Sequence, residues 1–457
     1  MTASLFDSPL HAQLFPTGET GRLFTDSAAI RAMLLVLGAL ARAQGARGVI
    51  PEISAAAISR AAMEVAIDPG QLAAATGADG VSLPGLVTAF RAAMEAPEHA
   101  QYVHWGATSQ DIQDSALMLR LRQALTLAEA DLAAILDRLA ELARAHAERP
   151  MAARSFGQAA APTSFGAQAA EWGWPLLALR RELPALRAGA LWVSLSGAAG
   201  TGAALGHQAA ALRADLARAL RLGDPGRSWH ADRGPVLRLA DWFTRLTLGL
   251  GKLGEDITAL AQTGIAEIDL GAAAGASSTL PQKTNPVAAA ALVALGRQAA
   301  GLHSVLQGAA MPRHQRDGAT LMTEWLVLPQ IVLGSASAAR LARRALDALA
   351  PRPARMAAGL AATQGLVHAE ALSFALAERM PRPAAQEAVK SACAEARETG
   401  TPLDRIAARR WPDLDLAAIF DPARQLGAAP ETARGFARAV ADTAADAATG
   451  SGAEDSG

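Results

Sequence analysis

Residues 109–147, SQDIQDSALMLRLRQALTLAEADLAAILDRLAELARAHA, decide the fold class of this chain. Apolar residues recur in this stretch at steps of three and four, which is the spacing of one face of an α-helix, and Pro150 follows its end. The recurring positions are Leu117, Leu121, Ala124, Ala128, Leu132, Ile135, Leu139 and Leu142. The pattern predicts one helix of roughly 55 to 60 Å, since each helical residue adds about 1.5 Å.

The rest of the chain has the same character. Alanine, leucine and arginine dominate, only 4% of the residues are aromatic, and no stretch alternates apolar and polar positions with β-branched side chains. We therefore expect an all-α fold. Four further long helices are predicted, which form a central five-helix bundle with the first, at residues 163–188, 235–268, 286–308 and 319–349.

The bundle divides the predicted chain into three domains. Residues 1–105 form an N-terminal helical domain, residues 106–350 the long-helix bundle, and residues 351–457 a C-terminal helical domain. The polar, acidic tail from Gly450 to Gly457 is expected to be disordered. Stripes of alanine and leucine on more than one face of the bundle helices indicate oligomerisation, although they do not fix the number of subunits.

The composition excludes several classes of function. With 457 residues, 51% of them hydrophobic, the chain can bury a large core, and its net charge of −1 gives no footprint for nucleic acid or an anionic membrane. The single Cys393 excludes internal disulfides and thiolate metal cages, and the nine histidines lack a metal-ligand spacing. The first residues carry no secretory signal, and the apolar stretches fall short of the roughly 18 residues that cross a bilayer. We expect a soluble, cytoplasmic protein without a metal site.

The segment Gly275-Ala276-Ser277-Ser278-Thr279-Leu280-Pro281-Gln282-Lys283-Thr284-Asn285-Pro286 carries the most chemical information. It sets two hydroxyls, Ser277 and Ser278, beside Lys283 and the amide of Asn285, on a loop before a helix start. Asn285 can cap that helix and the following proline suits its first turn, so free N–H groups and the positive end of the helix dipole face the loop. The grouping predicts a binding site for a substrate rich in carboxylates.

A second motif, His104 to Asp111, precedes the long helix. Thr108 and Asp111 resemble a capping box with aspartate in place of glutamate, and an ordinary helix cap is the simpler interpretation. A cap leaves His104 and the two residues after it without a reason. We therefore favour a second carboxylate site, formed by the hydroxyls of Thr108 and Ser109 with the free N–H groups of the helix start.

Other segments give weaker signals. Arg154 to Thr163, which contains Gln158, is typical of a plain connecting loop. His314 to Asp317 and Glu324-Trp325 are typical of a solvated, charged connection, and Arg316 gains a role only if the substrate has more than one carboxylate.

The glycine-rich run Ser196 to Gly202 lacks the preceding strand and the following acidic residue of a nucleotide-binding loop. We interpret it as a turn where two backbones pass closely. Three isolated histidines, His207, His230 and His303, are interpreted as structural rather than as ligands.

In this order on a helical chain, three of these segments resemble the motifs of the fumarase/aspartase superfamily. His104 to Asp111 is similar to the first motif, Arg154 to Gly166 to the second, and the run of residues 275–286 to the signature loop, with its core Ser-Ser-x-x-Pro-x-Lys-x-Asn-Pro. Within that superfamily, residues 104–115 together with Arg316 and Glu324-Trp325 most resemble bacterial cycloisomerases that close a carboxylated muconate into a lactone.

The resemblance implies an all-α, three-domain subunit and a homotetramer whose sites each combine three subunits, with no metal or organic cofactor. By position, Ser277 corresponds to the catalytic serine and Lys283 to the catalytic partner that meets the developing charge; the neighbouring Ser278 remains an alternative proton carrier. The implied substrate-binding residues are His104, Thr108, Ser109, Gln158, Ser278, Asn285 and Arg316.

One departure from the superfamily pattern concerns the reaction. Where its elimination lyases place a general-acid histidine, two residues before the glutamine of the second motif, this chain has Phe156. An amine leaving group needs a proton, whereas an internal carboxylate leaves as a stable anion, so Phe156 favours a lactone. Thr284 replaces a common arginine, which leaves Arg316, Arg154 or Arg313 to hold the remaining carboxylate. The alternatives are an adenylosuccinate or argininosuccinate lyase and an inactive helical scaffold of the same fold.

Overall fold

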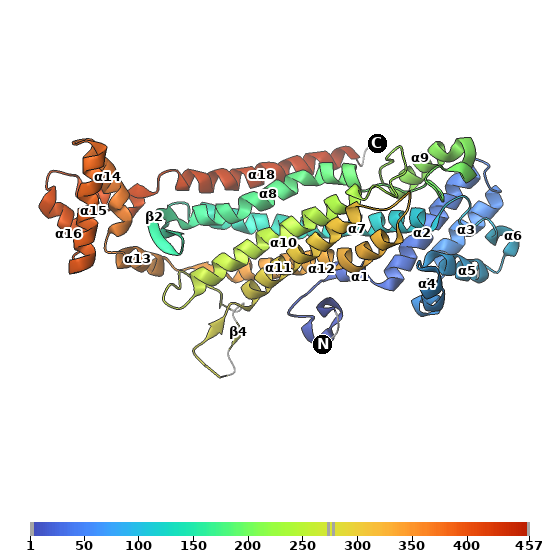
Figure 1. Ribbon diagram of the computed structural model, residues 1–457, viewed down its shortest axis with the longest axis horizontal. Coiled ribbons are helices and arrows are strands. Elements are labelled where there is room, and N and C mark those ends of the chain that lie inside the picture. Colours follow the sequence, from blue (N-terminus) through green and yellow to red (C-terminus); the bar gives the residue numbers. More distant parts are fainter. Residues whose placement is uncertain (1–3, 272–274, 277–278, 455–457) are drawn as a thin grey trace. The chain divides into compact units, whose positions relative to one another are not determined.

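The chain is helical along most of its length in the computed structural model, which describes residues 4–271, 275–276 and 279–454 (Figure 1). The prediction of an all-α fold with five long helices is confirmed. Those helices are α7 (Ser109–Ala145), α8 (Phe165–Ala190), α10 (Gly234–Ala261), α11 (Val287–Gln307) and α12 (Gly318–Ala348). The predicted extension of α10 to residue 268 is wrong, because Gly264 and Ala266 take φ values of 94° and 51° and end the helical path.

The chain divides into two compact units. The first unit contains residues 1–131, 179–250 and 294–340, and the second contains residues 132–178, 251–293 and 341–457. Each of the five long helices contributes one part to each unit. The division into three domains stays a prediction.

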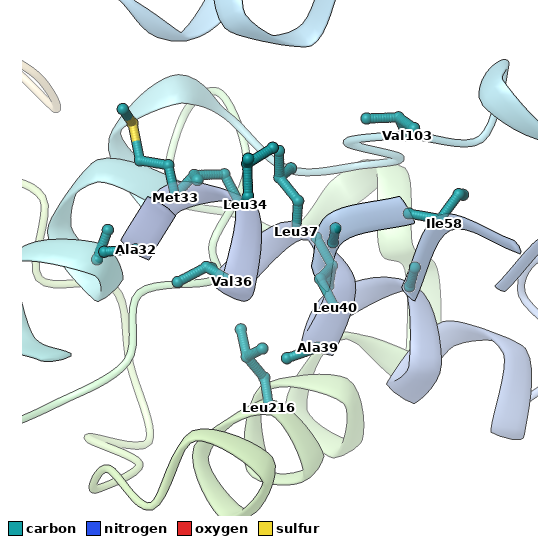
Figure 2. Packing of buried hydrophobic residues seen from close by; sticks show 14 of the residues in the cluster. Ala32, Met33, Leu34, Val36, Leu37, Ala39, Leu40, Ile58, Val103 and Leu216 are labelled. Carbon is teal, nitrogen blue, oxygen red and sulfur yellow. The ribbon is translucent and has the colours of Figure 1, made fainter. Parts of the chain in front are cut away.

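The first unit has a leucine-rich core built on α2. Its shorter helices are α1 (Glu19–Arg22), α2 (Asp26–Ala46), α3 (Glu52–Glu64), α4 (Ala73–Asp79), α5 (Leu83–Ala93), α6 (Pro97–Ala100) and α9 (Ala209–Leu220). Leu34, Leu37 and Leu40 of α2 are buried with Ile58 of α3 and Leu216 of α9 (Figure 2). Each fully buried leucine stabilises the fold by about 1.5 to 3 kcal/mol. This core supports the start of α7, where the first candidate motif lies.

The second unit has a separate core among its C-terminal helices. These are α13 (Pro353–Ala362), α14 (Ala369–Ala377), α15 (Arg382–Thr399), α16 (Leu403–Arg410), α17 (Leu416–Ile419) and α18 (Ala429–Glu454). Leu372, Val389, Leu403 and Ile406 are buried in it. Two short antiparallel ladders pair β3 (Ile268–Asp269) with β6 (Ala350–Pro351) and β4 (Gly275–Ala276) with β5 (Thr284–Asn285).

The segment predicted as a plain connecting loop is a β-hairpin. β1 (Pro150–Ser155) pairs antiparallel with β2 (Gln158–Ser164), and the two residues between them, Phe156 and Gly157, take φ values of 52° and 74°. Two consecutive positive φ values are the geometry of a tight hairpin turn. Sequence reasoning missed the strands because five of their residues are alanine, which has a low strand propensity.

In the described ranges, three helices are long and apolar enough, by length and composition alone, to cross a membrane: α2, residues 287–310, and α12. The expectation that no apolar segment reaches this length is therefore wrong. The most apolar window is 67% buried within the protein in α2 and 72% buried in α12, but only 39% buried in residues 287–310. Packing inside the protein accounts for the apolar character of α2 and α12.

Candidate functional site

A tight turn, residues 104–106, delivers the chain to the start of α7. His104 and Gly106 take φ values of 66° and 72°. A Cβ atom added to Gly106 would lie 2.4 Å from Cδ2 of Leu205, so glycine is required there. The Trp105 carbonyl accepts a hydrogen bond of 2.7 Å from Nε2 of Gln44. These contacts explain the presence of Gly106, which a simple helix cap left unexplained, and hold the backbone at Trp105.

His104 has an unusual environment for a titratable side chain. Burial lowers the pKa of His104, and a hydrogen bond with the Thr108 backbone only partly opposes that effect. Its Nε2 is buried and has no hydrogen-bond partner among the described residues. A neutral imidazole with one uncommitted nitrogen can bind a polar ligand.

The carboxylate of Asp111 accepts hydrogen bonds from several segments of this region. Its Oδ2 accepts the N–H groups of Thr108 and Gly197, each at 2.9 Å. Its Oδ1 is bonded to Ser194 Oγ at 3.0 Å, the Ser196 N–H at 2.9 Å and His230 Nε2 at 2.8 Å. Asp111 is 0% exposed. The predicted capping contact is therefore present, and the same carboxylate also ties the run Ser196 to Gly202 to the start of α7.

Among the described residues, the charge of Asp111 is stabilised without an arginine or lysine contact. Burial by itself raises the pKa of Asp111, but the hydrogen bond and charge of His230, with the backbone donors, hold that pKa below its ordinary value. His230 is buried and serves this carboxylate, which agrees with its interpretation as a structural histidine.

Arg316 meets the start of α7. Its Nη1 donates to Thr108 Oγ1 at 2.7 Å, and its Nε donates to Gln110 Oε1 at 3.3 Å. Asp317 fixes the segment that carries it, by accepting the N–H groups of Arg313 and Ala319. In the part of the chain that the structure describes, no carboxylate forms an ion pair with Arg316. A guanidinium beside a hydroxyl at a helix start is suited to bind an anion.

A buried ion triad lies one turn further along α7. Arg233 donates to both oxygens of Asp114, at 3.0 and 2.9 Å, and to both oxygens of Glu324, at 2.7 Å each. Burial lowers the pKa of Arg233, but the two carboxylates more than offset this and raise it above its ordinary value. The interpretation of Glu324 as part of a solvated connection is wrong, because this side chain is buried within α12.

Sequence reasoning missed Asp114 and Arg233. One signal for Asp114 was its position three residues after Asp111, which places both carboxylates on one face of α7. No sequence signal pointed to Arg233 as the partner of Asp114, because the two residues lie 119 positions apart along the chain.

In the second unit, Arg154 is committed to an internal partner. Its two terminal nitrogens donate to the two oxygens of Glu267, at 2.8 and 3.0 Å, and the Glu267 side chain is 1% exposed. A bidentate pair of this kind leaves little capacity for a substrate. The suggestion that Arg154 holds a substrate carboxylate is therefore not supported, whereas Arg316 keeps that capacity.

The signature loop is described in part. Asn285 pairs with Gly275 in the β4–β5 ladder, and the Lys283 N–H donates to the Leu280 carbonyl at 3.0 Å. The Lys283 side chain is exposed. The carbonyl of Pro286 accepts the N–H of Ala290, so α11 begins one residue later than predicted.

The predicted site residues fall into three groups. His104, Thr108, Ser109 and Arg316 belong to the first unit, and the structure brings Thr108 and Arg316 into direct contact. Gln158, Lys283 and Asn285 belong to the second unit, and their meeting with the first group stays a prediction. Ser277 and Ser278 lie outside the described residues.

The chain is similar in sequence to known proteins along most of its length. The sequence pattern of a family described as lyase matches residues 16–301. The 3-carboxy-cis,cis-muconate cycloisomerase of Pseudomonas aeruginosa is 38% identical over 418 residues, which cover 89% of this chain and 91% of that protein. The nitrosuccinate lyase of Streptomyces davaonensis is 35% identical, and the alignment covers 94% of each chain.

Solved structures agree with these relatives. The crystal structure of the 3-carboxy-cis,cis-muconate lactonizing enzyme from Pseudomonas putida superposes with a TM-score of 0.89 and 33% sequence identity. That superposition covers 96% of this chain and 100% of the other. The similarity therefore spans both compact units.

Proposed function

Because the chain belongs to this lyase family, part of the fumarase/aspartase superfamily, we propose that it is a cofactor-independent intramolecular lyase. It interconverts 3-carboxy-cis,cis-muconate and 4-carboxymuconolactone, a step of protocatechuate breakdown by the β-ketoadipate route. The observation that carries this proposal is similarity along almost the whole chain to proteins named 3-carboxy-cis,cis-muconate cycloisomerase, in four species at 34 to 38% identity.

The contact between Thr108 and Arg316 supplies one half of the proposed site. A carboxylate placed at the start of α7 receives charged hydrogen bonds from Arg316, and the Thr108 hydroxyl can donate to it as well. Ser109 at the first position of α7 and the uncommitted Nε2 of His104 add polar contacts beside it. Gln158 and Asn285 complete substrate binding from the other motifs.

The reaction adds a carboxylate of the substrate across a cis double bond of the same molecule. Its oxygen forms a bond to one alkene carbon, and the π electrons move toward the carbon beside a second carboxylate. The resulting enediolate-like polyanion takes a proton at that carbon from Ser277. In the reverse direction Ser277 removes this proton, and the ring carboxylate departs as an anion.

Electrostatic stabilisation dominates the rate in this proposal. Lys283, Asn285 and the N–H groups at the starts of α7 and α11 meet the extra charge, and losing one such donor typically costs about 2.7 to 4 kcal/mol. Each unit by which the pKa of the Ser277 hydroxyl falls requires about 1.4 kcal/mol of alkoxide stabilisation. A helix dipole gives only about 0.3 to 2 kcal/mol, so Lys283 is needed as well.

Phe156 distinguishes the proposed reaction from elimination of an amine. The carboxylate released in the reverse reaction needs no proton, so the second motif needs no acid at position 156. The adenylosuccinate and argininosuccinate lyase alternatives require one for their amine leaving groups. The alternative of an inactive scaffold gives no reason for Lys283 and Asn285 to occupy their positions in the signature loop.

The test is a direct assay of the purified protein. We expect 3-carboxy-cis,cis-muconate to be consumed, followed by its ultraviolet absorbance, with one solvent deuterium entering the lactone carbon that Ser277 protonates. Adenylosuccinate, argininosuccinate and nitrosuccinate are tested in parallel, the last because a relative bears that name. Turnover of one of these three without turnover of the muconate would contradict the proposal.

Two variants assign the proton carrier. Ser277→Ala should abolish turnover and deuterium exchange, whereas Ser278→Ala should retain exchange. The opposite result assigns the role to Ser278, and retention of both activities by both variants excludes a serine.

We also propose a cytoplasmic homotetramer whose sites combine residues of different subunits. Its native mass should be about four times the 47.0 kDa of the chain. If sites are shared, mixing the separately inactive Ser277→Ala and Arg316→Met proteins under conditions of subunit exchange restores activity. A native monomer with full activity excludes shared sites.

A further inference from the structure

A cavity separate from Thr108 and Arg316 lies within the first unit. It has a volume of about 370 Å³ and is lined by the start of α2, by residues 113–120 of α7 and by residues 321–329 of α12. Cavities that bind small organic molecules have volumes of about 300 to 1,000 Å³. Its walls include the apolar side chains of Met33, Leu117 and Leu328. We refer to it as the Arg120 cavity.

Arg120 is a cation in this cavity that forms no direct ion pair among the described residues. Its Nε is buried and has no hydrogen-bond partner among the described residues. Within the part of the chain that the structure describes, its Nη1 donates only to the Leu23 carbonyl, at 3.5 Å, and its guanidinium lies 5.6 Å from the ring centroid of Phe24. Burial lowers the pKa of Arg120 to about 10, although the exposed Asp26 opposes this. A cation that is partly buried without an ionic partner is destabilising, and a ligand carboxylate would relieve this cost.

Gln113 presents an uncommitted acceptor to the same cavity. It lies seven residues before Arg120, two turns earlier on the same face of α7, with Leu117 between them. Its Oε1 is buried without a partner in the described chain, while its Nε2 donates to Ser82 Oγ at 3.4 Å. An O–H or N–H group of a ligand would satisfy this oxygen.

The acidic side chains of the cavity limit the charge of the ligand. Asp114 and Glu324 also line it, and both are held by Arg233. Burial raises the pKa of Glu324, but two hydrogen bonds from Arg233 favour its carboxylate form, in which the triad carries one negative charge in excess. Asp26 adds another at the exposed end of α2. Solvent screens the exposed Asp26, so a single carboxylate directed at Arg120 can still gain an ion pair, whereas further carboxylates on the ligand are repelled by the excess charge of the triad.

We propose that the Arg120 cavity binds a small aromatic hydroxy acid with one carboxylate. The carboxylate pairs with Arg120, the hydroxyl donates to Oε1 of Gln113, and the ring packs against Leu117 and the other apolar walls. A rigid ring with its polar groups at opposite ends matches two polar positions that are separated by two helical turns. This inference does not depend on the proposed reaction, whose substrate carries three carboxylates.

The test is isothermal titration calorimetry of the intact protein with 4-hydroxybenzoate. Matched probes are 4-hydroxybenzamide, which keeps the shape without the charge, and benzoate, which lacks the hydroxyl. A charged hydrogen bond to a buried partner corresponds to roughly 10- to 150-fold in affinity, so the amide should bind at least about 10-fold more weakly. Benzoate should lose less, about 3- to 10-fold, because a neutral hydrogen bond is weaker.

Variants locate the bound probe. Arg120→Met should weaken 4-hydroxybenzoate binding at least about 10-fold while leaving the amide unchanged, and Gln113→Leu should remove the difference between 4-hydroxybenzoate and benzoate. Arg122→Met is the matched control: Arg122 is on the same helix but does not line the cavity, and its guanidinium serves the carbonyls of Leu220 and Arg221. This control should bind the probe as the wild type does.

Thermal denaturation separates binding from folding. Arg120→Met should melt no lower than the wild type, since it removes a partly buried cation that forms no ion pair with the described residues. The probe should raise the melting temperature of the wild type only. If Arg120→Met folds poorly, the affinities of 4-hydroxybenzoate and 4-hydroxybenzamide for the wild type still test whether the cavity binds a carboxylate. The proposal is overturned by no binding, by equal binding of acid and amide, by unchanged binding in Arg120→Met, or by loss of binding in Arg316→Met.

Discussion

Replacing Asp111 by asparagine tests whether one carboxylate organises the start of α7. The substitution keeps the shape of the side chain but turns one acceptor oxygen into an NH₂ donor. If the NH₂ group takes the place of Oδ2, it faces the backbone N–H groups of Thr108 and Gly197, which cannot become acceptors. If it takes the place of Oδ1, the Ser194 hydroxyl can rotate and the His230 ring can change tautomer, so that only the Ser196 N–H loses its acceptor. The second orientation is therefore preferred.

The cost follows from these contacts. One buried N–H without an acceptor costs about 1 to 3 kcal/mol. The bonds from Thr108 and Gly197 remain, but their acceptor becomes neutral, which weakens each by roughly 1 kcal/mol. We expect Asp111→Asn to lower the free energy of unfolding by about 3 to 5 kcal/mol. Turnover should fall too, because Thr108 loses part of what fixes it beside Arg316.

The assay is urea denaturation at one fixed protein concentration, since oligomer stability depends on concentration. Hydrogen exchange at the amides of Thr108, Ser196 and Gly197 should accelerate in Asp111→Asn. The control is Asp137→Asn on the same helix, an exposed position, where the change should stay within about 0.5 kcal/mol. A loss below about 1 kcal/mol in Asp111→Asn, with wild-type exchange at those amides, would refute the reasoning.

Three further predictions concern the neighbouring charges. Arg316→Met should lower kcat/KM by roughly 100- to 1,000-fold, since it removes one preorganised donor. The control Arg313→Met, in the same segment, should have little effect. Comparable losses of kcat/KM in both variants would contradict a specific role for Arg316. Arg233→Met should lower the free energy of unfolding, measured by urea denaturation, by about 3 to 5 kcal/mol, because it leaves two buried carboxylates without their arginine. An unchanged free energy would mean that the triad is not buried in solution. The pKa of His104 is lowered in the folded state, so the unfolded chain binds more protons as the pH falls. The contribution of His104 to the free energy of unfolding is therefore fully present above the unfolded pKa of about 6.5 and is lost as the pH falls below that value. His104→Gln should flatten the stability profile in that range, and an unchanged profile would contradict the burial of this ring.

The long helices could be predicted because their signal is local. Each places apolar residues at helical spacing over more than 20 residues, and such a pattern leaves few alternatives. The end of α10 was missed because Gly264, whose positive φ suits a glycine after a helix, was not taken as a stop signal, and because the second positive φ falls on Ala266, for which no residue preference exists. The β1–β2 hairpin was missed because Phe156, at its tip, is not a typical residue for a positive φ.

The polar contacts of the site were harder to predict, because a side chain does not reveal its partner. Arg154 and Arg316 are equivalent on paper: each lies near a recognisable motif and each could hold a substrate carboxylate. The structure separates them through Glu267, a residue with no motif of its own, which occupies Arg154 from 113 positions away. Arg316 meets a hydroxyl and an amide oxygen instead, so its charge is not neutralised by a carboxylate among the described residues.

The same distinction explains why the candidate site and the Arg120 cavity attract different ligands. At the start of α7, no carboxylate of the described chain is paired with Arg316. A polycarboxylate that binds there is therefore not repelled by a carboxylate paired with that arginine. In the Arg120 cavity the triad has already placed one excess negative charge nearby, so only a ligand with a single carboxylate gains from Arg120. Neutralising the triad should therefore relax the second preference and leave the first intact. Glu324→Gln is expected to let the cavity accept terephthalate, a dicarboxylate of similar shape, in calorimetry; if terephthalate still fails to bind while 4-hydroxybenzoate binds, the excess charge is not what limits the ligand.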